Sequence, residues 1–168
     1  MSQMAPQNGG YQSSPAAQQQ DPQYMMNECR TVTDETNNLK ARLGDLRNAQ
    51  TRSLSDPNNT AAKSQLESMN ADITTQYKSL MARLKYLKSR PAAASPMNRN
   101  QIGLAERTLR DAWQDFQTLE AEYRRKIREQ IERQYRITRP DATNEEVRQA
   151  SEDPNVQIFS QALMSSNR

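Results

Sequence analysis

The side chains that carry most protein catalysis are scarce in this chain of 168 residues. It contains no His and a single Cys, Cys29, so it lacks both a Cys/His metal cluster and the base of a nucleophilic triad. It also lacks a Gly-rich loop that could cradle phosphate and the G-x-S-x-G sequence of hydrolases. Carboxylates could bind a metal or act as acid and base, but here they are scattered along polar stretches. We therefore expect no enzymatic activity, no cofactor and no metal.

Basic residues offer a second kind of chemistry, the binding of phosphate groups. The chain has a formal net charge of +3, and its basic residues gather modestly between residues 124 and 139. These are Arg124, Arg125, Lys126, Arg128, Arg133, Arg136 and Arg139. Four glutamates, at positions 120, 122, 129 and 132, interleave with them, which is typical of a solvated helix face with i to i+4 ion pairs. We favour that interpretation over a nucleic-acid or anionic-membrane surface, which stays a weaker alternative.

The overall composition favours an all-α chain. Hydrophobic residues make up 34% and charged residues 26%, which is too polar for a thick globular core but suits helices that each bury one stripe. Only four Gly are present, fewer than sheets and tight hairpins need. No run approaches the ~20 apolar residues of a membrane-spanning helix, and the N-terminus lacks the features of a secretory signal. The sequence therefore predicts a soluble, cytosolic chain, and its end at Arg168 without a stop signal suggests a fragment.

Three long amphipathic segments predict three helices, at about residues 22–54, 60–89 and 98–138. The first begins at Asp21-Pro22, an N-cap residue followed by Pro, and ends before a turn at residues 55–59. The second ends before Pro91, which opens a loop that we expect to be flexible. The third opens at Asn98 with a capping box to Gln101 and stops before Pro140. Residues 1–21, rich in Gln, Ser and Pro, are predicted to be disordered.

Apolar residues recur along each segment at steps of three and four, the pattern of helices that pack side by side. The positions assigned to the core are Val32, Leu39, Leu43, Leu46, Leu66, Ile73, Leu80, Leu84, Leu109, Phe116, Leu119 and Ile127. Short connections between long helices predict an elongated antiparallel up-down-up three-helix bundle over residues 22–139. Residues 140–168 read as a partly helical linker, with one capping box at Thr143 and Glu146 and a second helix start at Asp153-Pro154.

The linker carries a resemblance to a known family. The run Gln130-Ile-Glu-Arg-Gln-Tyr-Arg-Ile-Thr-Arg-Pro-Asp-Ala-Thr-Asn-Glu-Glu-Val147, followed by Asp153-Pro-Asn-Val-Gln-Ile-Phe-Ser-Gln-Ala162, resembles the end of the third helix and the linker of syntaxins, above all the Sso-type plasma-membrane syntaxins of fungi. The matching residues are Ile137, Thr138, Thr143, Glu145, Glu146, Ile158 and Phe159. Residues 22–129 match only in helix layout.

The resemblance implies a regulatory role. Syntaxins are Qa-type SNAREs, or t-SNAREs, that drive vesicle fusion in exocytosis, and their N-terminal three-helix Habc domain controls SNARE assembly. It folds onto the SNARE helix and helps to bind Sec/Munc-type (SM) proteins. The implied partners are therefore the chain's own SNARE helix, other SNAREs and an SM protein. The SNARE helix and membrane anchor would follow Arg168, so we expect membrane contact only through that anchor, at the cytoplasmic face of the plasma membrane. Periodicity alone would equally allow a spectrin-like or coiled-coil scaffold.

Two candidates for the groove that receives a partner helix are Trp113 and Tyr86. Trp113 lies one position off its stripe, so it either covers the bundle edge or anchors a partner. Tyr86 stands beside a stripe position and allows either interpretation. In the linker, Ser151-Glu152 replaces the Leu-Glu of animal plasma-membrane syntaxins, so we do not expect that contact to latch a closed state tightly. Residues 1–20 carry no charge and lack the Asp-Arg-Thr-like motif that docks some syntaxins on the SM partner.

Overall fold

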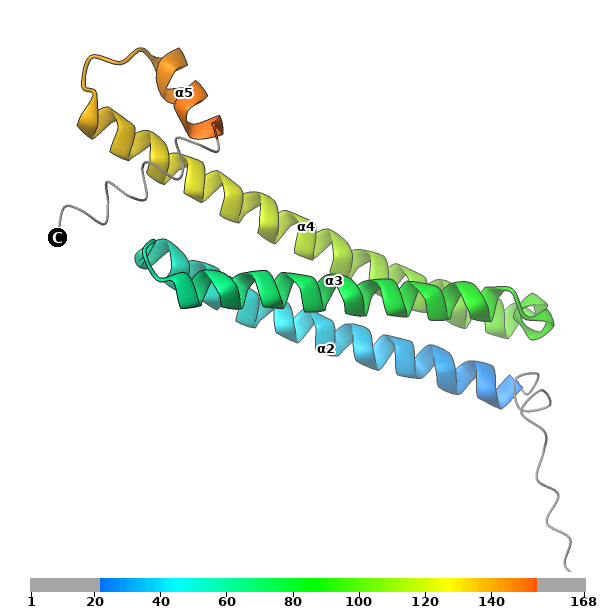
Figure 1. Cartoon of the computed structure of the whole chain (residues 1–168). Helices are drawn as coiled ribbons and strands as arrows, with labels where there is room; N and C mark the ends of the chain where they lie inside the picture. Colours follow the sequence, from blue (N-terminus) through cyan, green and yellow to red (C-terminus); the bar gives the residue numbers. More distant parts are fainter. Residues whose placement is uncertain (1–21, 154–168) are drawn as a thin grey trace, which may run out of the picture.

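The computed structural model describes residues 22–153, and the secondary structure of this part of the chain consists of helices joined by short turns. Its elements are α2 (Pro22–Ser55), α3 (Thr60–Lys88), a short 3-10 turn (Pro91–Ala94), α4 (Pro96–Thr138) and α5 (Asn144–Glu152). The helices α2, α3 and α4 run antiparallel in turn along one long rod (Figure 1), which confirms the predicted all-α bundle. The predicted disorder of residues 1–21 and the helix start beyond Asp153 lie outside the described residues, as do Ile158 and Phe159.

The start of α4 differs from the prediction. The helix begins at Pro96, and its N-cap is Ser95, whose hydroxyl accepts a hydrogen bond from the Asn98 backbone N–H at 3.3 Å. Asn98 is instead a buried residue whose side-chain Nδ2 donates to the Ala92 carbonyl at 2.9 Å. A Ser followed by Pro at the first helical position is the stronger start signal. The preceding loop, expected to be flexible, is ordered as the 3-10 turn Pro91–Ala94.

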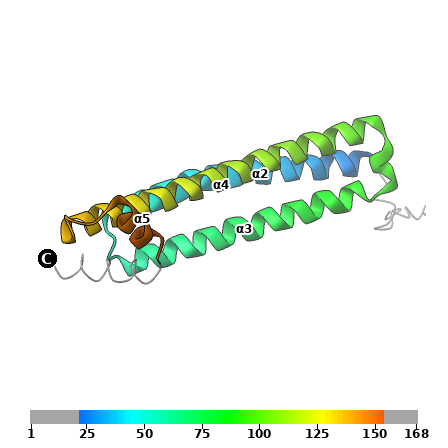
Figure 2. The same ribbon diagram turned by 90° about the horizontal axis from the view of Figure 1, so that it is seen from above.

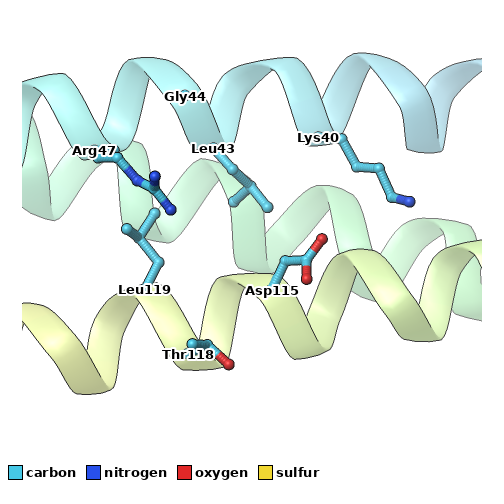
Figure 3. Close-up of a pocket in the computed structure, with 7 residues that line it drawn as sticks. All are labelled: Lys40, Leu43, Gly44, Arg47, Asp115, Thr118 and Leu119. Atoms are coloured by element: carbon cyan, nitrogen blue, oxygen red, sulfur yellow. The ribbon is translucent and has the colours of Figure 1, made fainter.

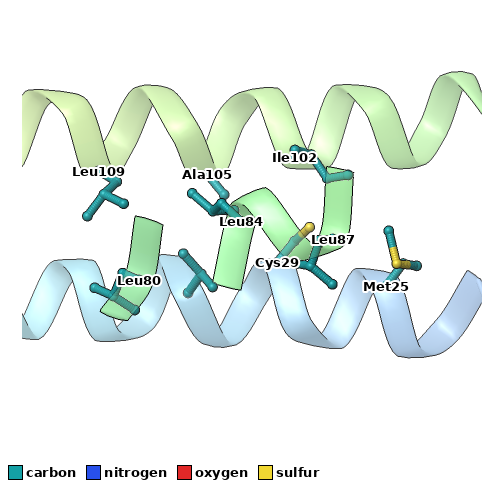
Figure 4. Close-up of a cluster of buried hydrophobic side chains, with 9 residues drawn as sticks. Met25, Cys29, Leu80, Leu84, Leu87, Ile102, Ala105 and Leu109 are labelled. Atoms are coloured by element: carbon teal, nitrogen blue, oxygen red, sulfur yellow. The ribbon is translucent and has the colours of Figure 1, made fainter. Parts of the chain in front are cut away.

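The core follows the three stripes and divides into two clusters. One cluster lies near the 3-10 turn and is drawn in Figure 4. Its buried members are Met25, Cys29, Val32, Leu80, Leu84, Leu87, Ile102, Ala105 and Leu109. The other lies toward the α2–α3 turn, and its buried members are Leu39, Leu43, Leu46, Ala49, Leu66, Ile73, Ala112, Phe116 and Leu119. Burial raises the pKa of the Cys29 thiol, so this side chain behaves as a small core residue.

Ile127 is the one assigned core residue that the structure leaves partly exposed. The side-chain amide of Gln130 donates to the carbonyl of Leu54 at 2.8 Å, and Leu54 is the last residue but one of α2. From about Gln130 onward α4 therefore extends beyond the end of α2. Figure 1 shows this overhang of α4 beyond the bundle. Ile127 therefore lies at the rim of the core, where it has fewer neighbours to cover it.

The three helices do not share their contacts equally. α2 packs extensively against both α3 and α4, whereas α3 and α4 pack against each other much less. The α2–α3 edge is also held by charge: Arg83 pairs with Glu28 at 3.1 Å and with Glu35 at 2.9 Å. The interface between α3 and α4 is consequently the least extensive of the three.

Candidate helix-binding seam and linker hairpin

An aromatic pair joins α3 to α4 halfway along the least extensive interface. The rings of Tyr77 and Trp113 stack with their centroids 4.1 Å apart and an interplanar angle of 21°. Trp113 also contacts Phe116, with the two ring centroids 5.2 Å apart and an angle of 42° between the ring planes. Phe116 is buried, but Tyr77 and Trp113 are only partly buried. The stack therefore covers the core and at the same time presents aromatic surface to the outside.

Polar contacts hold the two helices together on either side of the stack. Toward the 3-10 turn, Lys88 Nζ lies 2.8 Å from Glu106 Oε1. Toward the α2–α3 turn, Asn70 Nδ2 donates to Glu120 Oε2 at 3.4 Å. We call the surface formed by Asn70, Tyr77, Lys88, Glu106, Trp113 and Glu120 the α3–α4 seam.

Glu120 has an unusual environment for a carboxylate. One of its oxygens also accepts a hydrogen bond from Gln50 Nε2 of α2 at 2.9 Å, so this side chain links all three helices. Burial raises the pKa of Glu120, while Arg124 and the two amide donors work against that rise. The carboxylate is thus a partly desolvated polar link within an otherwise apolar bundle.

Tyr86 lies on a different face from Trp113. It is 42% exposed and lines a cavity of about 310 Å³ together with Glu28, Arg83 and Leu87, between α2 and α3. The Arg90 guanidinium lies over its ring, 5.4 Å from the centroid. The structure does not bring the two groove candidates together, because Tyr86 of α3 faces α2 whereas Trp113 of α4 faces α3. Only Trp113 lies on the α3–α4 seam.

The linker residues form a helical hairpin with the end of α4. α5 folds back onto the overhang of α4, with Val147, Ala150 and Ser151 buried against it (Figure 1). Its predicted capping box is present: Thr143 Oγ1 accepts from the Glu146 backbone N–H at 3.2 Å, and Glu146 Oε2 accepts from the Thr143 N–H at 2.8 Å. A nine-residue helix would be marginal alone, so its packing on α4 stabilises it.

The other linker residues divide between this interface and the surface. Ser151 is 1% exposed, and its hydroxyl lies 2.8 Å from the Arg148 carbonyl and 3.2 Å from Glu132 Oε1. Glu152 is exposed, as is Ile137 at 71%. Glu145 is also on the surface, where hydrogen bonds from Arg148 lower the pKa of its carboxyl. Thr138 donates to the Gln134 carbonyl at 3.0 Å near the end of α4. Ser151 is therefore a packing position of the hairpin.

A hollow of about 410 Å³ lies between α2 and α4, on another face of the bundle (Figure 3). Leu43 and Leu119 approach each other across it, and Lys40, Arg47 and Asp115 stand around them. The rim carries both signs of charge. This face therefore offers no single ligand chemistry.

The basic run of α4 behaves as a solvated face. Arg125 Nη1 lies 3.0 Å from Glu129 Oε1, an i to i+4 ion pair in which both side chains are largely exposed. Within residues 22–153 no cluster of three or more His, Cys, Asp or Glu could hold a metal ion. In the same part of the chain no helix is long and apolar enough to cross a membrane.

Comparison with known proteins gives one consistent result. A family model described as Syntaxin matches residues 21–163. "Protein transport protein SSO2" of Candida albicans is 28% identical over 149 residues, which covers 85% of this chain and 50% of that protein. "Protein SSO2" and "Protein SSO1" of Saccharomyces cerevisiae are 48% and 45% identical over 56 residues, or 33% of this chain and 19% of each protein. The chain thus spans at most about half the length of these relatives.

Proposed function

The chain belongs to the syntaxin family, and from this premise we propose that residues 22–153 are the regulatory N-terminal part of a t-SNARE. In this proposal the bundle is a syntaxin Habc domain that controls SNARE assembly during vesicle docking and fusion. The similarity to fungal SSO proteins, one of them named a protein transport protein, supports that role and a place at the cytoplasmic face of the plasma membrane. The proposal assigns no catalytic step to the chain.

The mechanism we propose is recognition of an amphipathic helix laid along the α3–α4 seam. The observation that carries it is the half-buried Tyr77–Trp113 stack on the least extensive interface of the bundle. A helix packed there would complete a four-helix bundle and cover the surface of Tyr77 and Trp113 that is now partly exposed to solvent. Trp and Tyr are the residues most often found as anchors of such contacts. The occupant we propose is the chain's own SNARE helix.

The linker hairpin supports an intramolecular occupant. Because α5 packs against α4 and turns back along it, the described chain ends heading back along α4 toward the bundle. A short tether of this kind supplies an effective concentration on the order of millimolar, so even weak contacts can close the domain. We therefore propose that the seam binds its own SNARE helix in cis and binds a free helix only weakly. We also propose that other SNAREs and an SM protein bind the domain, either in an open form with the SNARE helix released or in a closed form with that helix docked.

The experiment compares SNARE assembly rates of the cytosolic protein, with its SNARE helix attached, before and after Trp113→Ala. The variant should assemble faster if Trp113 contacts the docked helix. The matched control is Leu104→Ala, which removes a 49% exposed apolar side chain two positions before Glu106 and so about 200° away around α4. Leu104→Ala should leave the rate unchanged. Unchanged rates for both variants, with both proteins folded, would contradict the proposed seam.

A further inference from the structure

The end of the rod that carries the 3-10 turn has a strong charge bias. Residues 85–110 contain six basic residues and one acidic residue, whereas the whole chain has 23 and 20. The basic residues are Lys85, Lys88, Arg90, Arg99, Arg107 and Arg110. No Asp or Glu occurs between residues 89 and 105, the stretch that forms the turn and the start of α4. On the neighbouring α2, Glu28 and Glu35 are both engaged by Arg83.

A cavity of about 600 Å³ opens at this corner. Lys88, Arg90 and Arg99 line it from both sides of the turn, together with Glu106. Glu106 pairs with Lys88, so it neutralises only one of the three cations. Arg99 donates to the Ala94 carbonyl at 3.3 Å, and Arg90 lies over the Tyr86 ring. Neither guanidinium has a carboxylate partner among the described residues, so the cavity presents two uncompensated positive charges.

The hydrogen-bonding capacity of this corner is not used up by the chain itself. Arg90 Nε is buried and has no hydrogen-bond partner among the described residues, and the same holds for Asn98 Oδ1. An unpaired buried donor is costly, so a rotation of the Arg90 side chain that turned Nε toward an anionic acceptor would remove that cost. The cavity is therefore suited to the oxygens of a phosphate group.

The tip beside the cavity is apolar and lies at the end of the rod. Residues 91–98 carry no charge, and Met97 is 59% exposed at the first turn of α4. Pro91, Ala94 and Pro96, which precede it in the sequence, are exposed as well. Figure 2 shows the connection between α3 and α4 at the extreme end of the rod, away from α5. An uncharged apolar tip flanked by cations matches the boundary between lipid headgroups and acyl chains.

We propose that this corner docks the bundle end-on to an anionic membrane surface, with Arg90 and Arg99 holding a lipid headgroup phosphate and Met97 at the interface. The site adjoins the α3–α4 seam, with which it shares Lys88 and Glu106, but it does not depend on the proposed SNARE regulation. It also departs from the expectation that the chain meets the membrane only through a C-terminal anchor. An uncharged, exposed apolar tip at the end of a rod favours a bilayer over a nucleic acid or an acidic peptide, which would need a groove or stacking surfaces.

The test is co-sedimentation of the chain with vesicles of phosphatidylcholine alone or with added phosphatidylserine. The chain should bind only the anionic vesicles, and salt should weaken the binding. Each basic residue near an anionic surface contributes about 1 kcal/mol, or about fivefold in affinity, so Arg90→Gln with Arg99→Gln should lower it by roughly tenfold or more. Met97→Ser should lower it severalfold by removing the apolar contact.

The matched control is Arg52→Gln with Arg133→Gln, which removes the same charge from two exposed residues nearer the other end of the rod. Melting curves of each variant verify that it is folded. Equal losses for the two double variants would overturn the proposal, since binding would then follow net charge alone. Absence of vesicle binding by the unmodified chain would overturn it as well. Binding of inorganic phosphate at the corner without vesicle binding would assign the cavity to a free anion and overturn the membrane site.

Discussion

Replacement of Phe116 by Ala should destabilise the bundle severely. Phe116 is 8% exposed and belongs to the core cluster toward the α2–α3 turn, and its ring centroid lies 5.2 Å from that of Trp113, so truncation leaves a cavity under the aromatic stack. Substitutions of this type cost about 3–5 kcal/mol. Domains are stable by only about 5–15 kcal/mol, so about a fifth or more of the stability should be lost.

The assay is equilibrium unfolding in urea, followed by helical circular dichroism, with Arg125→Ala as the control. Arg125 makes an exposed ion pair with Glu129, and such pairs contribute about 0.3–0.5 kcal/mol. The midpoint should fall far for Phe116→Ala and hardly move for Arg125→Ala. Similar midpoints for the two variants would refute the assignment of Phe116 to the core.

Three further predictions concern the linker hairpin and the polar link. Thr143→Ala should weaken α5 by about 1 kcal/mol through loss of its N-cap, and hydrogen exchange should then speed up in residues 144–152; unchanged protection would contradict the cap. Ser151→Leu should overpack the hairpin by about 1–3 kcal/mol and release α5, while the melting temperature of the bundle stays nearly constant; a matching loss in the bundle would contradict separate unfolding. Burial raises the pKa of Glu120, so the ionised form of this side chain destabilises the folded state. Glu120→Gln should therefore stabilise the chain at pH 7. Below the unfolded pKa of about 4.5 Glu120 is protonated in both states, so the stabilising effect of the substitution should disappear. Urea melts at pH 7 and pH 4 compare the stability of this variant with that of the unmodified chain. An equal difference at both values of pH would contradict the raised pKa of Glu120.

The helices could be predicted closely because their ends carry local signals. Pro22, Asn59 and Pro140 mark where helices begin or stop, and the structure places the ends within one or two residues of the expected ones. The start of α4 shows the largest difference, two residues, because Ser95 and Asn98 both offer plausible caps and only packing decides between them. Asn98 is needed inside, where it binds the Ala92 carbonyl.

The candidate site was less accessible to prediction. A stripe shows that Tyr77 and Trp113 lie near the inner faces of their helices, but their stacking depends on the register between α3 and α4, which no local signal encodes. For the same reason the sequence could not show that Tyr86 faces α2. The basic corner was not predicted because the denser run of Arg along α4 dominates the charge pattern of the sequence. The absence of any Asp or Glu between residues 89 and 105 is the signal that could have identified it.

The most direct test of the proposed regulation compares two rates of SNARE assembly. One is that of the cytosolic protein with its SNARE helix attached, and the other is that of a version lacking residues 1–139. If the seam holds the SNARE helix in cis, removal of the bundle should speed assembly measurably. Equal rates would contradict autoinhibition and would leave recruitment of partners as the role of the bundle.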